Sequence, residues 1–254
     1  MDMGLNGRTV IVTGGAGGIG RHISEGFAAE GAHVVVAYKS SPDKAERVAK
    51  GIEQNGGRAL TAPFALDDPE SAGALVAAAL DWSGRIDVLI NNAVSWGGTA
   101  PSGNGGYEDV PDDDWQGMVR ANIEGAIRLS RAVTPAMRER RWGRMVHISS
   151  ALAVVGGAGT EYYAASKAAL HGFSRSAAFS LGKDGDILSN VVMPGLTRTE
   201  TNAHIADEHS DHYSALSPLG RLLDAAEVAN SVVYLGSAAN TGITGQAIMV
   251  SGGV

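Results

Sequence analysis

Tyr163 and Lys167 are the residues of this sequence whose types and spacing best suit acid–base chemistry. Their separation of four positions places a phenol and an ammonium on one face of a helix. A nearby cation favours the phenolate, which lowers the pKa of a tyrosine and lets it exchange a proton with a carbonyl oxygen near neutral pH. The same pair is common on helix surfaces without any chemical role, so the rest of the chain has to decide between the two interpretations.

A glycine-rich segment, residues 14–20, lies between a β-branched run at 8–13 and a helical pattern that begins near residue 20. Glycine allows a tight turn and a close approach of the backbone to phosphate. The start of the following helix offers free N–H groups and a positive dipole end. Strand, glycine-rich turn and helix together predict a dinucleotide site.

The end of the second predicted strand, residues 33–37, indicates which dinucleotide is bound. Tyr38, Lys39 and Ser40 follow this strand, and none of them is acidic. An NAD site uses a carboxylate there for the ribose 2′-hydroxyl, whereas a cation and hydroxyl groups suit a 2′-phosphate. The segment favours NADP(H) over NAD(H), although an ordinary solvated lysine carries equal weight.

Predicted strands and helices alternate along the chain, which favours an α/β fold with a parallel sheet and helices on both faces. A long helix is expected at 115–141, and a helix at 161–181 carries Tyr163 and Lys167. The segment 95–111 is rich in Gly, Ser and Pro, and is either a surface loop or one wall of a substrate cleft. A weak helical pattern at 196–218 predicts a lid. The whole chain, residues 1–254, is expected to form one domain.

Composition narrows the possible functions. The 254 residues carry a net charge of −7, which argues against nucleic acid or an anionic membrane as the main partner. The absence of cysteine excludes disulfides and thiolate catalysis. No signal region or membrane-length apolar run is evident, so a cytoplasmic location is expected. His204, His209 and His212 lack a metal-ligand spacing, and no metal site is predicted.

The order of the motifs resembles the short-chain dehydrogenase/reductase family over nearly the whole chain. Thr13-Gly14 with Gly18-Ile19-Gly20 matches the family's Thr-Gly-x-x-x-Gly-x-Gly loop, and Tyr163 with Lys167 matches its Tyr-x-x-x-Lys pair. The other positions assigned through this resemblance are Asn92 and Ala93, Asn122, Ser150, Pro194, Gly195, Thr197 and Thr199. Val94 departs from the pattern, since the family has glycine there.

The resemblance implies a fold, an assembly and a set of roles. The fold is a three-layer Rossmann fold, a doubly wound sheet of seven parallel strands, and the assembly is a homotetramer. Ser150 would bind the substrate carbonyl, and Tyr163 would transfer the proton. Lys167 would hold the nicotinamide ribose and lower the pKa of Tyr163, while Asn122 would order a water that replaces the proton. The residues that would contact the cofactor are Gly14, Gly18, Ile19, Gly20, Tyr38, Lys39, Ser40, Asn92, Ala93, Tyr163, Lys167, Pro194, Gly195, Thr197 and Thr199.

Within the family, the chain is most similar to the 3-oxoacyl-carrier-protein reductase branch and to ketoreductases of bacterial polyketide metabolism. Arg141 matches one basic carrier-docking position of that branch, but Asp184 occupies the other and would repel an acidic carrier. An NADPH-dependent ketoreductase acting on a free, bulky cyclic or aromatic ketone is therefore the favoured function. The alternatives are a 3-oxoacyl-carrier-protein reductase, an NAD-dependent alcohol dehydrogenase and a non-catalytic nucleotide-binding regulator.

Overall fold

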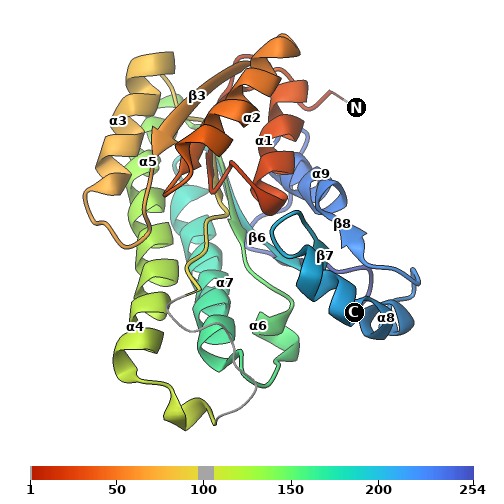
Figure 1. Cartoon of the computed structure of the whole chain (residues 1–254). Helices are drawn as coiled ribbons and strands as arrows, with labels where there is room; N and C mark the ends of the chain where they lie inside the picture. Colours follow the sequence, from red (N-terminus) through yellow and green to blue (C-terminus); the bar gives the residue numbers. More distant parts are fainter. Residues whose placement is uncertain (1, 97–105) are drawn as a thin grey trace.

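A seven-stranded parallel sheet forms the centre of the computed structural model, which describes residues 2–96 and 106–254. The strand order is β3-β2-β1-β4-β5-β6-β9, with helices on both faces (Figure 1). This order reverses direction between β1 and β4, which is the arrangement of a doubly wound nucleotide-binding fold. The predicted Rossmann fold and its seven strands are confirmed.

The central strands are short runs rich in β-branched and aliphatic residues, as expected for strands buried on both faces, whereas the edge strands β3 and β9 are partly exposed. Their bounds are β1 (Thr9–Thr13), β2 (His33–Tyr38), β3 (Arg58–Pro63), β4 (Val88–Asn91), β5 (Trp142–Ile148), β6 (Asp186–Pro194) and β9 (Ala247–Val250). A separate two-stranded sheet pairs β7 (Thr197–Arg198) with β8 (Leu223–Asp224). Its strand β7 lies in the predicted lid region 196–218, whereas β8 follows that region.

Two hydrophobic clusters cover the two faces of the sheet. Successive strand residues point to opposite faces, so Val10 and Val12 join one cluster and Ile11 joins the other. The first cluster packs under α1 (Gly18–Ala29), α2 (Pro42–Gln54) and α9 (Ala225–Leu235). The second packs under α3 (Ser71–Ser83), α5 (Ala126–Arg140) and α7 (Glu161–Leu181). The core therefore holds the carboxyl ends of the central strands in fixed positions.

The long helix predicted at 115–141 is interrupted. It consists of α4 (Asp112–Arg120), a π-helical turn η2 (Ala121–Gly125) and α5. It begins three residues earlier than predicted, because three aspartates in its first turn suit the positive end of the helix dipole. It ends at Arg140, since Arg141 adopts a left-handed conformation with φ of 52°. A π-helical turn is often found at a functional site, and this one contains Asn122.

The remaining connections lie at the carboxyl edge of the sheet. The short helix α6 (Leu152–Val155) follows β5, and the predicted lid at 196–218 contains the helix α8 (Ala203–Leu216). In the predicted loop at 95–111, Ser95 and Trp96 and the 3₁₀ turn η1 (Tyr107–Asp109) are described, whereas residues 97–105 lie outside the described part of the chain. The interpretation of that loop as a cleft wall is therefore tested only at its two ends.

Candidate active site

The predicted site residues gather where the carboxyl ends of β1, β4, β5 and β6 meet. Gly14 follows β1, Asn92 follows β4, Ser150 follows β5 and Pro194 ends β6. Tyr163 and Lys167 come from α7, which packs against β6 and β5. In an open α/β sheet this edge, next to the reversal of strand order, is where ligands bind. The structure thus brings together residues that are up to 180 positions apart in the sequence.

The turn between β1 and α1 is held against β4 by Thr13 and Asn92. The Thr13 hydroxyl accepts hydrogen bonds from the backbone N–H groups of Asn92 (2.9 Å) and Ala93 (3.0 Å). In return the Asn92 amide donates to the Thr13 carbonyl at 2.9 Å. A Cβ at Gly20 would lie 2.2 Å from the carbonyl oxygen of Gly14, so only glycine fits at that position. These contacts build a rigid glycine cradle at the start of α1.

The start of α1 binds an anionic group of the protein itself. The N–H of Gly18 donates to a carboxylate oxygen of Glu200 at 3.0 Å. Burial raises the pKa of Glu200, but hydrogen bonds from its own backbone N–H and that of Gly18, with the charges of Arg21 and His22, outweigh burial and leave the pKa lowered. The carboxylate stands in for a phosphate oxygen, so this cradle fits the pyrophosphate of a dinucleotide.

Lys39, predicted to bind a 2′-phosphate, forms an ion pair with Asp67. Its ammonium lies 3.0 Å and 2.8 Å from the two carboxylate oxygens, and both side chains are exposed. The hydrogen bond from Lys39 lowers the pKa of Asp67. Asp67 follows β3, the strand that neighbours β2. Lys39 therefore lies at the expected edge of the sheet, but the carboxylate of Asp67 already balances its charge.

Tyr163 and Ser150 lie close together at the centre of the site. The pKa of Tyr163 is raised by burial, and the hydrogen bond with Ser150 acts in the opposite direction without cancelling it. Lys167 lies 5.9 Å from the centre of the tyrosine ring and donates to the carbonyl of Ile148 at 2.9 Å. The predicted lowering of the Tyr163 pKa by Lys167 is therefore not seen in this structure, in which desolvation is the larger effect. Burial likewise lowers the pKa of Lys167 to about 8.

Asn122 is buried and its amide group is fully used. Its oxygen accepts the N–H of Ser95 at 2.8 Å, and its nitrogen donates to the Ser95 carbonyl at 2.9 Å and to the Ser166 hydroxyl at 3.2 Å. Ser166 in turn donates to the backbone carbonyl of Tyr163 at 2.8 Å. Asn122 therefore links the segment after β4 to the helix that carries Tyr163.

The segment after β6 is tied together around Asn202. Its amide accepts from the N–H and hydroxyl of Thr199, each at 2.8 Å, and donates to the carbonyl of Thr197 at 2.9 Å. The Thr197 hydroxyl donates to the Gly195 carbonyl at 3.0 Å, and the Pro194 carbonyl accepts the N–H of Ala151 at 2.8 Å. Thr199 also lies near Gly18 of the glycine cradle. This segment thus joins the end of β5 to the start of α1.

Two side chains of the site were not predicted from the sequence. Trp96 stacks on Tyr163, with ring centroids 4.5 Å apart and 17° between the ring planes. Glu200 occupies the start of α1, as described above. Trp96 lies two positions beyond Val94, and Glu200 directly follows Thr199. Both are adjacent to motif positions, but neither residue type belongs to a motif, so only the folded chain reveals their contacts.

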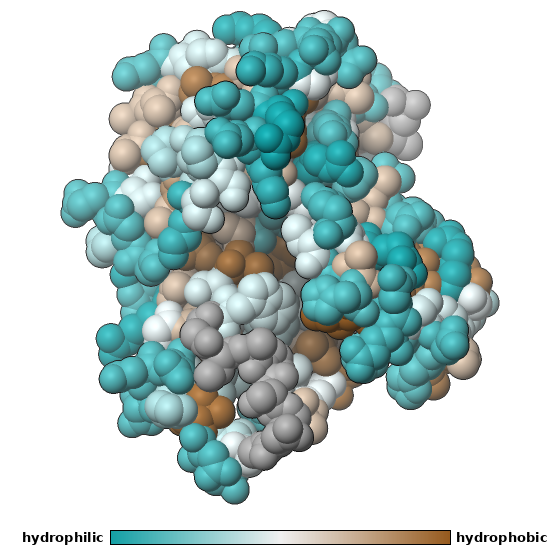
Figure 2. Space-filling model, in the orientation of Figure 1, coloured by the Kyte–Doolittle hydropathy of each residue, from teal (hydrophilic) through white to brown (hydrophobic). Residues whose placement is uncertain are grey.

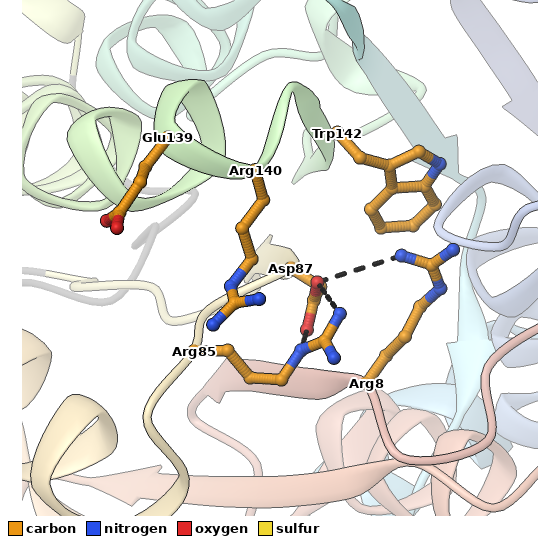
Figure 3. A pocket seen from close by; sticks show the side chains of 6 residues that line it. All are labelled: Arg8, Arg85, Asp87, Glu139, Arg140 and Trp142. Carbon is orange, nitrogen blue, oxygen red and sulfur yellow. Dashed lines mark hydrogen bonds and ion pairs between the residues drawn. The ribbon is translucent and has the colours of Figure 1, made fainter.

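A second group of charged residues lines a cavity of about 440 Å³ at the opposite, amino edge of the sheet (Figure 3). The buried carboxylate of Asp87 pairs with Arg85 at 2.7 Å and with Arg8 at 3.7 Å, and accepts the N–H of Thr9 at 2.8 Å. Arg8 also lies over the ring of Trp142, 3.5 Å from its centre. Two arginines thus share one buried carboxylate at the edge of the sheet opposite Tyr163, and we interpret the group as structural.

Neither a metal centre nor a membrane span is found in residues 2–96 and 106–254. No group of three or more His, Cys, Asp or Glu side chains in these ranges is arranged to hold a metal ion, and no helix there is long and apolar enough to cross a bilayer.

Comparison with known proteins identifies the family. A family model described as Enoyl-(Acyl carrier protein) reductase matches residues 14–254. L-rhamnose 1-dehydrogenase (NAD(P)(+)) from Sphingomonas sp. (strain SKA58) is 36% identical over 253 residues, covering 98% of this chain and 97% of that protein. The 3-oxoacyl-[acyl-carrier-protein] reductase FabG of Escherichia coli (strain K12) is 33% identical over 252 residues, covering 99% of each chain.

Similar solved structures support the same family as the sequence comparisons. A short chain dehydrogenase from Burkholderia cenocepacia J2315 in complex with NADP aligns with a TM-score of 0.88 at 33% identity, covering 98% of both chains. A 3-oxoacyl (acyl-carrier-protein) reductase from Agrobacterium tumefaciens C58 with NADP bound aligns with a TM-score of 0.90 at 29% identity, covering 100% of this chain and 96% of the other. The chain belongs to the short-chain dehydrogenase/reductase family of NAD(P)-dependent oxidoreductases, as its motifs predicted.

Proposed function

We propose that the protein is an NADPH-dependent ketoreductase that converts a free cyclic or aromatic ketone to a secondary alcohol. The observation that carries this proposal is the closeness of Tyr163 and Ser150, beside a glycine cradle that already binds a carboxylate. Two neighbouring O–H groups, one from a phenol and one from a serine, can both donate hydrogen bonds to one carbonyl oxygen. The cradle supplies the anion site that a dinucleotide requires.

Tyr163 is protonated at neutral pH, which is the form that the reduction of a ketone requires. A phenol with a pKa above its ordinary value stays protonated at neutral pH and is ready to donate a proton. Ser150 would hold the carbonyl oxygen, Tyr163 would protonate it, and Lys167 would hold the nucleotide ribose. When bound, the nicotinamide supplies the hydride. Asn122 would position the segment around Ser95, because its amide is already used by Ser95 and Ser166.

NADP(H) is the proposed cofactor. Lys39, with Tyr38 and Ser40 beside it, lies at the edge where the adenosine ribose is expected, and both solved relatives described above contain NADP. The remaining contacts would come from the backbone around Gly14, Gly18, Ile19 and Gly20, from Asn92 and Ala93, and from Pro194, Gly195, Thr197 and Thr199. The Lys39–Asp67 pair would moderate the preference over NAD(H).

A free ketone is proposed in place of a carrier-bound one because of the charge at the docking positions. Asp184 accepts a hydrogen bond from Arg138 at 2.6 Å, so a carboxylate and not a cation occupies the second position. An acidic carrier protein would meet reduced attraction there. A role in bacterial secondary metabolism follows from the resemblance of the sequence alone.

The rhamnose dehydrogenase relative supports a second candidate, the oxidation of a cyclic hydroxyl compound with NAD(P)⁺. The same residues would act in reverse, with Tyr163 as the base. Tyr163 would have to lose its proton before it could act as the base, so oxidation would require a higher pH than reduction.

The test is a comparison of initial rates with purified protein. NADPH consumption would be measured with β-tetralone, with ethyl acetoacetate and with a carrier-bound 3-oxoacyl thioester, and NAD(P)⁺ reduction with L-rhamnose. Faster reduction of β-tetralone than of the thioester is expected. Much faster turnover of the thioester would overturn the free-ketone proposal, and turnover of L-rhamnose alone would favour the second candidate.

We further propose that residues 1–254 act as one domain with a lid around 196–218, that the protein is a homotetramer, and that it works in the cytoplasm. These proposals rest on the family resemblance. Light scattering coupled to size-exclusion chromatography would measure the mass of the assembly, and a mass other than four chains would contradict the tetramer.

A further inference from the structure

Trp96 lies against the proposed proton donor without belonging to any matched motif. Its indole stacks on the Tyr163 ring with 4.5 Å between centroids, and it remains 50% exposed. Stacked carbon atoms approach to about 3.5–4.0 Å, so a centroid distance of 4.5 Å implies an offset pair. Because the indole is also larger than the phenol, part of its flat surface extends past the Tyr163 ring and stays open to a ligand.

The backbone before the indole is fixed before any ligand arrives. Asn122, which is 3% exposed, holds both the N–H and the carbonyl of Ser95, and Ser166 holds the amide of Asn122. Trp96 follows Ser95 directly. The fixed backbone of Ser95 and the stack on Tyr163 together hold the indole in place. The indole is therefore a pre-organised platform, which reduces the entropic cost of binding a ring against it.

Exposed apolar side chains are concentrated at the edge of the sheet that carries Trp96. Of the ten large hydrophobic side chains that are exposed in the described residues, eight lie on connections that leave the carboxyl ends of β4, β5 and β6. They are Val94, Trp96, Tyr107, Val154, Val155, Ile205, Leu216 and Leu219. Figure 2 shows hydrophobic surface inside the hollow of this face. Exposed apolar area concentrated at one edge of a fold marks a binding surface, here one suited to an uncharged ligand.

We propose that Trp96 is a substrate-positioning residue that selects flat ring systems. The ring of a cyclic or aromatic ketone stacks on the open part of the indole, which directs its carbonyl oxygen toward the hydroxyl groups of Tyr163 and Ser150. Acyclic ketones receive no such orientation. This inference rests on the proposed ketoreductase function and names the feature of the substrate that the site recognises.

The experiment compares Trp96→Ala and Trp96→Phe with a matched control, Trp115→Ala. Trp115 stacks on Tyr162, the neighbour of Tyr163, at 4.9 Å and 12°, so its removal deletes a similar stack away from the chemistry. For each variant, kcat and KM are measured with β-tetralone and with ethyl acetoacetate. Binding of β-naphthol, a planar ring without a ketone, is measured by calorimetry in the presence of NADP⁺ and in its absence.

Trp96→Ala should lower kcat/KM for β-tetralone about tenfold, mainly through KM, and should change the value for ethyl acetoacetate less than about twofold. Trp96→Phe should retain most of the wild-type kcat/KM for β-tetralone. Trp115→Ala should leave kcat/KM unchanged for both ketones. An equal loss with both ketones would overturn the proposal, because Trp96 would then only support Tyr163.

The binding measurement separates this inference from the proposed function. If wild-type protein reduces no ketone but β-naphthol binds about tenfold more weakly to Trp96→Ala, the platform stands and the reductase assignment fails. Equal binding of β-naphthol to wild type and Trp96→Ala overturns the platform, whatever the turnover shows.

Discussion

Two carboxylates hold the positions where phosphate groups of the cofactor are expected. Glu200 accepts the N–H of Gly18 at the start of α1, and Asp67 pairs with Lys39 beyond β2. Each is bound by a group that a phosphate would use, so each should compete with the cofactor. The two carboxylates should affect the nucleotides differently. Glu200 lies at the site of the pyrophosphate, which NADPH and NADH share, whereas Asp67 lies at the site of the 2′-phosphate, which only NADPH has.

Replacing Glu200 by Gln should tighten the binding of both NADPH and NADH by about three- to tenfold. The neutral amide binds the positive end of α1 less strongly and does not repel the pyrophosphate. Titration calorimetry of wild type and Glu200→Gln with each nucleotide measures the change. Unchanged or weaker binding would show that Glu200 supports the cofactor site and does not compete for it.

Replacing Asp67 by Asn should tighten NADPH about threefold or more and leave NADH nearly unchanged, because Lys39 is then free to pair with a 2′-phosphate. Lys39→Gln is the matched control and should weaken NADPH alone. Both variants are titrated with the two nucleotides. An equal effect on the binding of NADH and NADPH would show that Lys39 does not bind the 2′-phosphate.

At the scale of elements, the sequence predicts most of the framework. The helix Glu161–Leu181 has the predicted bounds, and α9 begins directly after Asp224. These features depend on local patterns. The π-helical turn around Asn122 could not be predicted, because it is specified by contacts with Ser95 and Ser166 that are distant in sequence. The roles of Trp96 and Glu200 could not be predicted either, because both residues contact groups that are distant in sequence.

The strand β5 carries a buried histidine that should make stability depend on pH. His147 is fully buried, bonded to the Asn91 amide at 3.1 Å, and burial, with a smaller effect of Lys167, lowers its pKa from 6.5 to about 4. The unfolded chain therefore binds the additional proton between pH 6.5 and 4. Its contribution to stability is complete above pH 6.5 and is lost as the pH falls toward 4.

Urea unfolding of wild type and His147→Gln tests this dependence. The variant should be less stable near neutral pH, but the difference in unfolding free energy should narrow by roughly 2 kcal/mol between about pH 7 and pH 5. Other titrating groups are shared by the two proteins and cancel in the difference. A gap that stays constant with pH would mean that His147 does not titrate differently in the folded and unfolded states.

At the scale of the whole molecule, the two edges of the sheet have different roles. The carboxyl edge carries Tyr163, Ser150 and the glycine cradle, whereas the amino edge carries the ion pairs of Asp87 with Arg8 and Arg85 (Figure 3). A buried carboxylate with two cationic partners stabilises the fold as a unit, and removing one charge leaves the others unbalanced. Changes at this edge should affect stability and not chemistry.

Asp87→Asn should therefore lower the free energy of unfolding by roughly 2–4 kcal/mol while leaving kcat/KM for a ketone within about twofold of wild type. Glu139→Gln is the control, because Glu139 lines the same cavity but is exposed, and its effect should stay within roughly 0.5 kcal/mol. For both variants, urea unfolding measures the free energy of unfolding and initial rates measure kcat/KM. A large loss of activity in folded Asp87→Asn would connect this edge to the site.

The most direct test of the proposed chemistry is the rate of NADPH-dependent reduction of β-tetralone by wild type and by Tyr163→Phe, with NADPH affinity measured alongside. Removing one hydroxyl leaves the ring, its stack with Trp96 and the glycine cradle in place. NADPH affinity should stay within about threefold, while the rate should fall by a factor of about 10²–10⁴, the usual contribution of a positioned acid. A Tyr163→Phe variant that retains the wild-type rate would contradict the assignment of Tyr163 as the proton donor.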